Sequence, residues 1–286
     1  MDKVNIQMLR DKKSNHHKIP MLAVSDYPFA KLAETANIDV LLVGDSIGMT
    51  VYGFSSLLPV TMDLMVPHTI AVRKGAPNAF LIGDLPFLTY EVTVEDAIRN
   101  SGMFMAKCGC DAVKLEGGRN RADVIEALVN ASIPVVGHIG FTPQQMTMQG
   151  GFVAAGHDVD SALRLVEDAT ILENAGICML LLEAVPADLA AIICQRVKVP
   201  VIGFGSGPDV DGQILLLHDL IGMFDSFSAK FAKKYINMSE LVVKALEDFI
   251  NETEKGEFPE QKNYFKMPEE QSAKLKMALA NPRTVH

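Results

Sequence analysis

The sequence is poor in cysteine. It has four cysteines in 286 residues, and none of them belongs to a CxxC pair. A chain of this length with so few cysteines does not depend on a disulfide framework. Cys108 and Cys110 flank a single glycine, and we interpret them as thiols packed beside a buried strand rather than as metal ligands. The motif HExxH is also absent, which disfavours a zinc enzyme.

The sequence also lacks long apolar runs and an excess of basic residues. Uncharged apolar segments such as Ile133–Gly140 are much shorter than the roughly 20 residues that span a bilayer. The N-terminal segment is polar and lacks the apolar core of a targeting signal. Lys and Arg number 26 against 35 Asp and Glu, so the net charge is −9, which opposes binding to nucleic acid. We expect a cytoplasmic protein with reduced thiols and with neither nucleic-acid nor membrane partners.

What the sequence does contain is short apolar runs separated by amphipathic segments. Hydrophobic residues make up 49% of the chain and charged residues 21%, which excludes intrinsic disorder. Most runs are continuously apolar, as in strands that are covered on both faces. Eight such strands alternating with helices predict a (β/α)8 TIM barrel, with a doubly wound open sheet as the alternative. The runs are Ile19–Val24, Asp39–Val43, Ala79–Gly83, Ala112–Leu115, Pro134–Gly137, Cys178–Leu182, Pro200–Phe204 and Leu220–Phe224.

The domain organisation is predicted to be simple. We expect a single α/β domain over residues 1–286, with an N-terminal helix and a polar C-terminal tail that is peripheral over about residues 266–286. An amphipathic helix is predicted at Ser239–Thr253 with Ser239 as its N-cap, and a short helix at Pro268–Ala280. Two connections exceed what a barrel needs and are expected to be functional loops. They are Ser46–Asp63 and Gly140–Asp158.

Polar or ionisable residues end nearly every apolar run. In a barrel, the C-terminal ends of the strands meet at one mouth, where barrel enzymes carry their catalytic groups. A single Asp or Ser after a strand is usually a helix N-cap, but capping alone does not account for seven polar strand ends. The residues at these ends are Ser25, Asp26, Asp45, Ser46, Asp84, Lys114, Glu116, His138, Glu183 and Ser206.

Three of these acids suit a divalent cation. Asp45, Asp84 and Glu116 belong to successive strands, and carboxylates are the ligands that Mg2+ prefers when water and substrate complete its octahedral shell. Lys114 is two positions before Glu116, so both side chains point the same way, into the barrel. A buried ammonium needs an anionic partner, which is either a substrate carboxylate or the acidic cluster in a structural salt bridge.

Three further residues have candidate roles, each with a structural alternative. Glu183 ends an otherwise apolar strand, where burial raises the pKa of a carboxyl group and makes it a better base; a capping or ion-paired Glu is the alternative. His138 is a candidate for binding or polarising a substrate, or else a packed interior histidine. Ser46 is a candidate donor to a substrate carboxylate, or else an N-cap.

Six longer motifs are far more specific than a short pattern. They are LLVGDSIGMTVYGFSSLLPVTMD at Leu41–Asp63, GDLPFLTY at Gly83–Tyr90, VKLEGG at Val113–Gly118, GHIGFTPQ at Gly137–Gln144, LLLEAVP at Leu180–Pro186 and DGQILLLHDLIG at Asp211–Gly222. Together they resemble the ketopantoate hydroxymethyltransferase family, also called 3-methyl-2-oxobutanoate hydroxymethyltransferases. The resemblance covers the chain from the N-terminal helix to about Phe265.

The resemblance implies a barrel of the phosphoenolpyruvate mutase and isocitrate lyase type, assembled as a homodecamer. It implies transfer of a hydroxymethyl group from 5,10-methylenetetrahydrofolate to the 2-oxo acid 2-oxoisovalerate, which gives ketopantoate for pantothenate and coenzyme A synthesis. By motif, Asp45 and Asp84 bind Mg2+, Glu116 lies in or next to the metal shell, and Glu183 accepts the proton. The residues that hold the oxo acid are Asp45, Ser46, Asp84, Lys114 and His138.

Some positions depart from the family pattern. Relatives usually have Tyr in place of Ser25, and GIGAG in place of the GFGSG that contains Ser206. The segment GGFVAAGH at Gly150–His157 lacks the Gln and the cation that the family usually has there, and the altered part is Phe152–His157. These changes raise the hypothesis that the oxo acid or the one-carbon donor differs from that of the family.

Two other functions are compatible with the sequence. One is an aldol-type enzyme that acts on another 2-oxo acid, with Lys114 forming a Schiff base. The other is a catalytically silent barrel kept for binding or assembly. The intact acids and Lys114 at the strand ends argue against a silent barrel.

Overall fold

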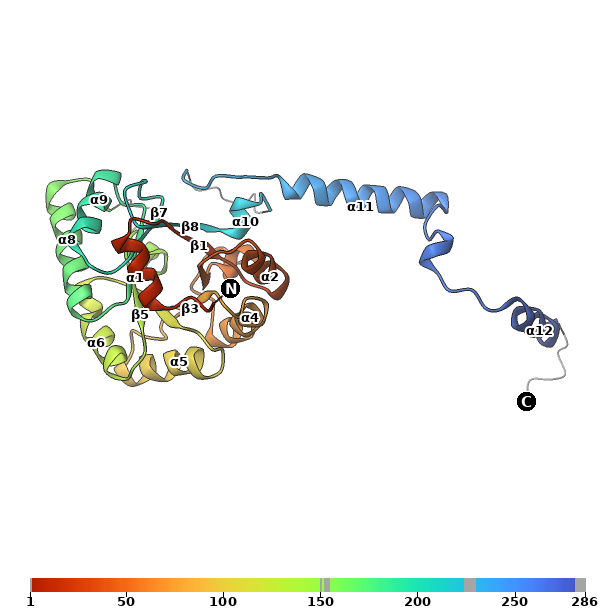
Figure 1. Ribbon diagram of the computed structural model, residues 1–286, viewed down its shortest axis with the longest axis horizontal. Coiled ribbons are helices and arrows are strands. Elements are labelled where there is room, and N and C mark those ends of the chain that lie inside the picture. The colour runs from red at the N-terminus through yellow and green to blue at the C-terminus, as the bar shows by residue number, and fades with distance from the viewer. Residues whose placement is uncertain (1, 150, 152–154, 224–229, 281–286) are drawn as a thin grey trace. The chain divides into compact units, whose positions relative to one another are not determined.

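The computed structural model describes residues 2–149, 151, 155–223 and 230–280 (Figure 1). The chain divides into two compact units, Met1–Ile236 and Asn237–His286. The single domain expected over residues 1–286 stays a prediction, and each unit is described by itself.

The first unit contains a closed barrel of eight parallel strands in sequence order, ringed by helices (Figure 1). The predicted (β/α)8 barrel is confirmed, and the open sheet is excluded. The strands are β1 Ile19–Ala23, β2 Val40–Val43, β3 Phe80–Asp84, β4 Ala112–Glu116, β5 Val135–Gly140, β6 Met179–Glu183, β7 Val201–Phe204 and β8 Gly212–Leu216. The helices are α1 Ile6–Ser14, α2 Tyr27–Thr35, α3 Ile47–Thr50, α4 Met62–Gly75, α5 Val94–Ala106, η1 Arg119–Arg121, α6 Ala122–Asn130, η2 Pro143–Gln145, α7 Met146–Gln149, α8 Val159–Asn174, α9 Ala187–Arg196 and α10 Leu217–Leu220.

The predicted position of the eighth strand is wrong. The structure has β8 at Gly212–Leu216, paired with β7 and β1, and not at Leu220–Phe224. Leu217–Leu220 forms the short helix α10 instead, and Phe224 lies outside the described residues. Because β7 ends at Phe204, only a short loop without a helix precedes β8, so the strict alternation of strand and helix placed the last strand too late.

Side chains that point into the barrel recur at every second position along each strand. On β3, Ile82 belongs to the apolar core and Asp84 follows it at the end of the strand. On β4, Ala112 begins the inward series, and Lys114 and Glu116 continue it. The lower layers of the barrel are therefore apolar, whereas the uppermost layer is charged. The inward series of β5 and β6 lead in the same way to His138 and Glu183.

The N-terminal segment closes the lower end of the barrel. Val4 and Leu9 are buried in the same apolar core as the inward side chains of the strands. Three lysines of this segment pair with aspartates that directly precede strands β4, β2 and β8. These pairs are Lys3–Asp111 at 2.5 Å, Lys12–Asp39 at 2.5 Å and Lys13–Asp211 at 2.6 Å. Ion pairs and apolar burial together make this end of the barrel a structural element.

The second unit consists of helices. They are α11 Met238–Lys255, η3 Gln261–Asn263 and α12 Glu269–Ala280. The two predicted C-terminal helices are confirmed, but the predicted cap is wrong because Asn237 is the N-cap of α11 and Ser239 lies in its first turn. Across the described residues, none of the helices is sufficiently long and apolar to traverse a membrane.

Gly212 provides a test of how β8 closes the barrel against β1. A Cβ atom at this position would lie 2.3 Å from the carbonyl oxygen of Ile19 and 2.6 Å from the side chain of Ile202. We expect Gly212→Ala to lower the free energy of unfolding by about 1–3 kcal/mol, because the β1 backbone must move to admit the methyl group. The measurement is the midpoint of urea unfolding.

Gly102→Ala is the matched control. Gly102 lies within α5 with nothing within 4 Å of the added Cβ, so this change is expected to stabilise the protein by about 0.5–1 kcal/mol. An unchanged midpoint for Gly212→Ala would contradict the close approach of β8 to β1.

Candidate active site

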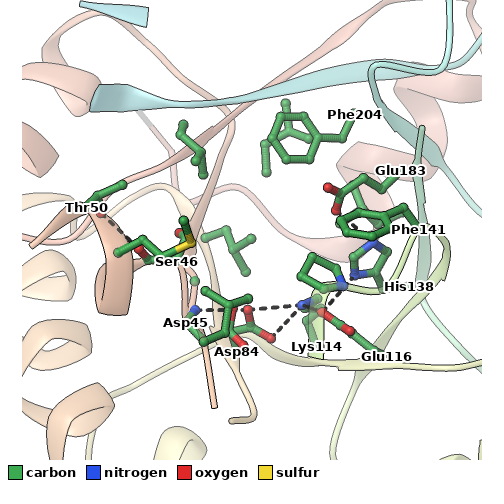
Figure 2. Close-up of a pocket in the computed structure, with 18 of the residues that line it drawn as sticks. Asp45, Ser46, Thr50, Asp84, Lys114, Glu116, His138, Phe141, Glu183 and Phe204 are labelled. Carbon is green, nitrogen blue, oxygen red and sulfur yellow. Dashed lines mark hydrogen bonds and ion pairs between the residues drawn. The ribbon is translucent and has the colours of Figure 1, made fainter. Parts of the chain in front are cut away.

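A cavity of about 310 Å3 opens at the C-terminal ends of the strands (Figure 2). All seven residues with predicted site roles line it, so the structure brings the predicted set together. They are Asp45, Ser46, Asp84, Lys114, Glu116, His138 and Glu183. Their individual roles in binding and catalysis stay predictions.

Lys114 lies at the centre of the charged layer. Its ammonium is 2.9 Å from Oδ1 of Asp84 and 3.1 Å from Oε1 of Glu116 (Figure 2). Burial alone lowers the pKa of an ammonium, but the carboxylates around Lys114 outweigh it and raise the pKa well above the usual value. Lys114 is therefore a buried cation, and the salt bridge that the sequence left as an alternative is present.

Asp45 and Asp84 form the acidic side of the cavity. The backbone N–H of Asp45 donates a hydrogen bond to Oδ2 of Asp84 at 3.1 Å. Burial raises the pKa of both carboxyl groups, and the charge of Asp84 raises that of Asp45 further. Oδ1 of Asp84 is buried and accepts no hydrogen bond within the described part of the chain, although the ammonium of Lys114 lies beside it. This oxygen and the crowding of negative charge fit a bound cation.

The donor set suits Mg2+ rather than a metal held by protein alone. The residues that the structure describes contain no cluster of three His, Cys, Asp or Glu side chains arranged to hold a metal. Mg2+ is usually held by one or two carboxylates, with water and substrate completing its shell, and Asp45 and Asp84 meet that requirement. Both oxygens of Glu116 already accept hydrogen bonds, Oε1 from Lys114 and Oε2 from the backbone N–H of Gln144 at 3.1 Å. This favours a place for Glu116 next to the metal shell.

His138 lies between two carboxylates. Its Nδ1 is 3.6 Å from Oε1 of Glu116, and its Nε2 is 3.2 Å from Oε2 of Glu183. Burial and the Lys114 charge lower the pKa of His138, but the two carboxylates outweigh them and raise it. Burial also raises the pKa of Glu183, whereas Lys114 and His138 overcome the effect of burial on Glu116 and lower its pKa to about 2. The two glutamates therefore differ in basicity, with Glu183 the better proton acceptor.

Gln144 and Tyr90 complete the site, and sequence reasoning missed both. The side-chain Nε2 of Gln144 donates to Oδ2 of Asp45 at 2.9 Å and to the carbonyl oxygen of Leu85 at 3.0 Å. The hydroxyl of Tyr90 donates to Oε1 of Gln144 at 2.6 Å and accepts the backbone N–H of Glu116 at 3.2 Å. These bonds fix the orientation of the amide and join the ends of β2, β4 and β5. The available signal was their position at the ends of the motifs GDLPFLTY and GHIGFTPQ.

Ser46 lies at the start of α3, in the long connection after β2. It is the N-cap residue, but its side chain makes no capping hydrogen bond, and it lines the cavity. The Ser46 hydroxyl therefore does not cap the helix, which was the structural alternative.

The two altered serines, Ser25 and Ser206, lie away from the cavity wall. The backbone carbonyl of Ser25 accepts a hydrogen bond from Nδ1 of His68 at 2.6 Å. Ser206 is fully buried; its Oγ donates to the carbonyl of Leu182 at 2.8 Å and accepts the N–H of Val185 at 3.2 Å, so it braces the backbone on both sides of Glu183. Of Phe152–His157, the first three residues lie outside the described residues, and His157 is exposed. Neither serine lines the cavity, so neither supports a changed substrate.

Tyr90→Phe tests the network that holds the carboxylates. Tyr90 is buried, with 1% of its surface exposed, and its hydroxyl is the partner of both Gln144 and the Glu116 backbone. We expect the variant to lose about 1–3 kcal/mol of unfolding free energy, because two buried polar groups lose a partner. Urea unfolding measures the loss.

Tyr52→Phe is the matched control, because the hydroxyl of Tyr52 bonds to His68 at 3.0 Å on an exposed side chain. Its loss is expected to be about 0.5 kcal/mol or less. Equal losses in the two variants would mean that the buried network adds no stability.

Known proteins resemble this chain at two levels. It is 44% identical over 270 residues to 3-methyl-2-oxobutanoate hydroxymethyltransferase from Syntrophomonas wolfei, which covers 94% of this chain and 98% of the relative. It is 47% identical over 264 residues to the protein of the same name from Moorella thermoacetica, which covers 92% and 98%.

Solved structures show the same fold at low identity. Phosphonopyruvate hydrolase, solved with oxalate and Mg2+, has a TM-score of 0.59 and 15% identity over 99% of this chain and 100% of that chain. A 2,3-dimethylmalate lyase of the PEP mutase/isocitrate lyase superfamily has a TM-score of 0.58 and 16% identity over 97% and 100%. These likenesses bear on the fold alone, and they agree with the predicted (β/α)8 barrel. Residues 3–261 match the family model described as ketopantoate hydroxymethyltransferase, and the chain therefore belongs to the ketopantoate hydroxymethyltransferase family.

Proposed function

We propose that this chain transfers a hydroxymethyl group from 5,10-methylenetetrahydrofolate to 2-oxoisovalerate and so makes ketopantoate for pantothenate and coenzyme A synthesis. Family membership and the shared name of the relatives support this function. The observation that carries it is one cavity that combines two acids suited to a cation, a buried ammonium and a buried basic carboxylate. A 2-oxo acid needs this combination to be bound and deprotonated at C3.

The charged layer of the cavity is proposed to bind the oxo acid. Asp45 and Asp84 would hold Mg2+, which when bound supplies a Lewis acid that polarises the keto oxygen. The ammonium of Lys114 and the hydroxyl of Ser46 donate hydrogen bonds to substrate oxygens. Because most of the cavity wall is apolar, these polar interactions act in a medium of low dielectric and gain strength.

Glu183 is the proposed proton acceptor. Its carboxylate takes the proton from C3, and the electron pair of that bond forms the new bond to the one-carbon unit. Both bonds between that carbon and the two folate nitrogens break, and water supplies the oxygen of the hydroxymethyl group. The proton from C3 and one proton of the water end on the two nitrogens, which leaves tetrahydrofolate. His138, with Nε2 3.2 Å from Oε2 of Glu183, orients the base and shares its charge.

The alternatives fit the site less well. A Schiff base requires a neutral amine, whereas the carboxylates around Lys114 raise its pKa and keep it charged. A silent barrel has no need of three buried carboxylates around a single ammonium, because buried charge in excess of its counter-ion costs free energy.

Proton exchange tests the proposed chemistry apart from the transfer step. We expect the C3 proton of 2-oxoisovalerate to exchange into deuterated water with Mg2+ and to stop exchanging when EDTA removes the metal, as followed by NMR. Glu183→Gln removes the base, so exchange should fall about 100-fold or more.

Glu167→Gln, at an exposed carboxylate paired with Arg119, is the matched control and should leave the exchange rate unchanged. Exchange of another 2-oxo acid but not of 2-oxoisovalerate would refute the proposed substrate, and full exchange in Glu183→Gln would refute the proposed base.

We also propose a cytoplasmic homodecamer, as the family resemblance implies. Large apolar side chains exposed on α11 support self-association. They include Leu241, Val242, Leu246, Phe249 and Ile250.

Light scattering of the full chain measures the assembly. We expect a mass close to ten times the chain mass of 31.1 kDa, and a lower mass for Leu246→Glu, which places a charge on the apolar face of α11. Glu252→Gln, on the same helix, is the control. A wild-type mass equal to that of one chain would refute the assembly.

A further inference from the structure

The cavity extends beyond the charged layer. Its other wall comes from the ends of β7 and β8 and from the segments that follow them, and it is largely apolar. The residues of this wall are Phe204, Ile214, Leu216, Asp219 and Phe231. In a closed ring of eight strands, β8 lies opposite β4, which carries Lys114 and Glu116. Figure 2 shows Phe204 well apart from the row formed by Asp84, Lys114 and Glu116.

Asp219 is the exception in this apolar wall. It belongs to α10, it lines the cavity, and only 7% of its surface is exposed. Among the described residues its carboxylate accepts no hydrogen bond and forms no ion pair. Burial raises its pKa, and the charge of Lys234 acts in the opposite direction.

The acids of the charged layer behave differently. Asp84 and Glu116 pair with Lys114, and Asp45 accepts the amide of Gln144. Polar groups in protein interiors almost always have hydrogen-bond partners. The carboxylate oxygens of Asp219 have no donor within the described chain, yet they are not among its fully buried atoms that lack a partner. They therefore keep access to the cavity, where a ligand can supply donors.

The chemistry of this wall identifies the ligand. A carboxylate is best satisfied by two parallel N–H donors held in one plane. The aromatic rings of Phe204 and Phe231, whose centroids are 4.7 Å apart, offer apolar surface to a flat ring. A reduced pterin has both features, because its 2-amino group and the neighbouring ring N–H lie side by side on one edge of a planar pyrimidinone.

We propose that Asp219 anchors the amino-pyrimidinone edge of the pterin of the one-carbon donor, with Phe204 and Phe231 against the ring. This inference rests on the proposed function, in which the donor is a folate. The pterin then occupies the β7–β8 side of the cavity, and the oxo acid occupies the β2–β6 side. The two substrates meet between Asp219 and the charged layer, which is where the one-carbon unit must pass to C3.

Asp219→Asn and Asp219→Ala test the anchor, because both remove the negative acceptor. Three quantities are measured on the full chain: the C3 exchange rate with Mg2+ and 2-oxoisovalerate alone, the KM for 5,10-methylenetetrahydrofolate in the complete reaction, and the Kd of tetrahydrofolate by calorimetry. We expect the KM and the Kd to rise about tenfold or more with the loss of a charge-assisted bidentate contact. The exchange rate should stay within about twofold of wild type, because the oxo acid binds on the opposite side.

Asp209→Asn, at an exposed aspartate on the loop before β8, is the matched control and should change none of the three quantities.

The outcomes separate the inference from the function on which it rests. Wild-type protein that exchanges the C3 proton, together with variants whose KM and Kd are unchanged, would overturn the anchor and leave the proposed function intact. Loss of exchange in parallel with the rise in KM would also overturn the anchor. Asp219 would then be needed for the structure of the whole cavity and not for folate binding alone. Wild-type protein without exchange would refute the proposed function. The Kd of tetrahydrofolate would still decide the anchor, because equal binding by wild type and Asp219→Asn contradicts it.

Discussion

The ammonium of Lys114 allows a group of buried acids to coexist at the top of the barrel. Asp84 and Glu116 lie within 3.1 Å of it, and without that charge they would repel each other in a medium where charges interact strongly. The ion pairs of Lys114 with Asp84 and Glu116 also make the pKa values of the acids differ. Lys114 keeps the pKa of Glu116 low, whereas burial leaves Glu183 more basic. One cation thereby creates both a place for a metal and a base that differs from its neighbours.

Much of this arrangement follows from the alternation of side chains along a buried strand, where every second residue points into the barrel. The apolar runs and the residues at their ends were enough to predict the barrel and to bring seven side chains to one cavity. The eighth strand was misplaced because β7 and β8 are joined without a helix, and nothing in the pattern of apolar residues marks a missing helix. The N-cap of α11 was misplaced for a related reason, because Asn237 and Ser239 are both good capping residues.

The side chains that sequence reasoning could not find are mostly neutral. Gln144 and Tyr90 are uncharged, so residue type alone did not indicate a role in the site. Their role in the hydrogen-bond network comes from contacts between residues far apart in the chain. Ser206 was named as a polar strand end, but the bracing of the backbone around Glu183 by its hydroxyl is likewise visible only in the contacts. Asp219 was visible in the motif DGQILLLHDLIG, but the misplaced strand hid its position on the cavity wall. Residue type predicts chemistry, whereas burial without a partner is visible only in three dimensions.

The closed lower end of the barrel restricts the route by which molecules reach the charged layer. Val4 and Leu9 seal the apolar core from below, and three lysine–aspartate pairs hold the seal in place. Every molecule that reaches the charged layer must therefore pass through the mouth. Under the proposed function, the oxo acid and the folate therefore share one entrance, and ketopantoate and tetrahydrofolate leave by the same route.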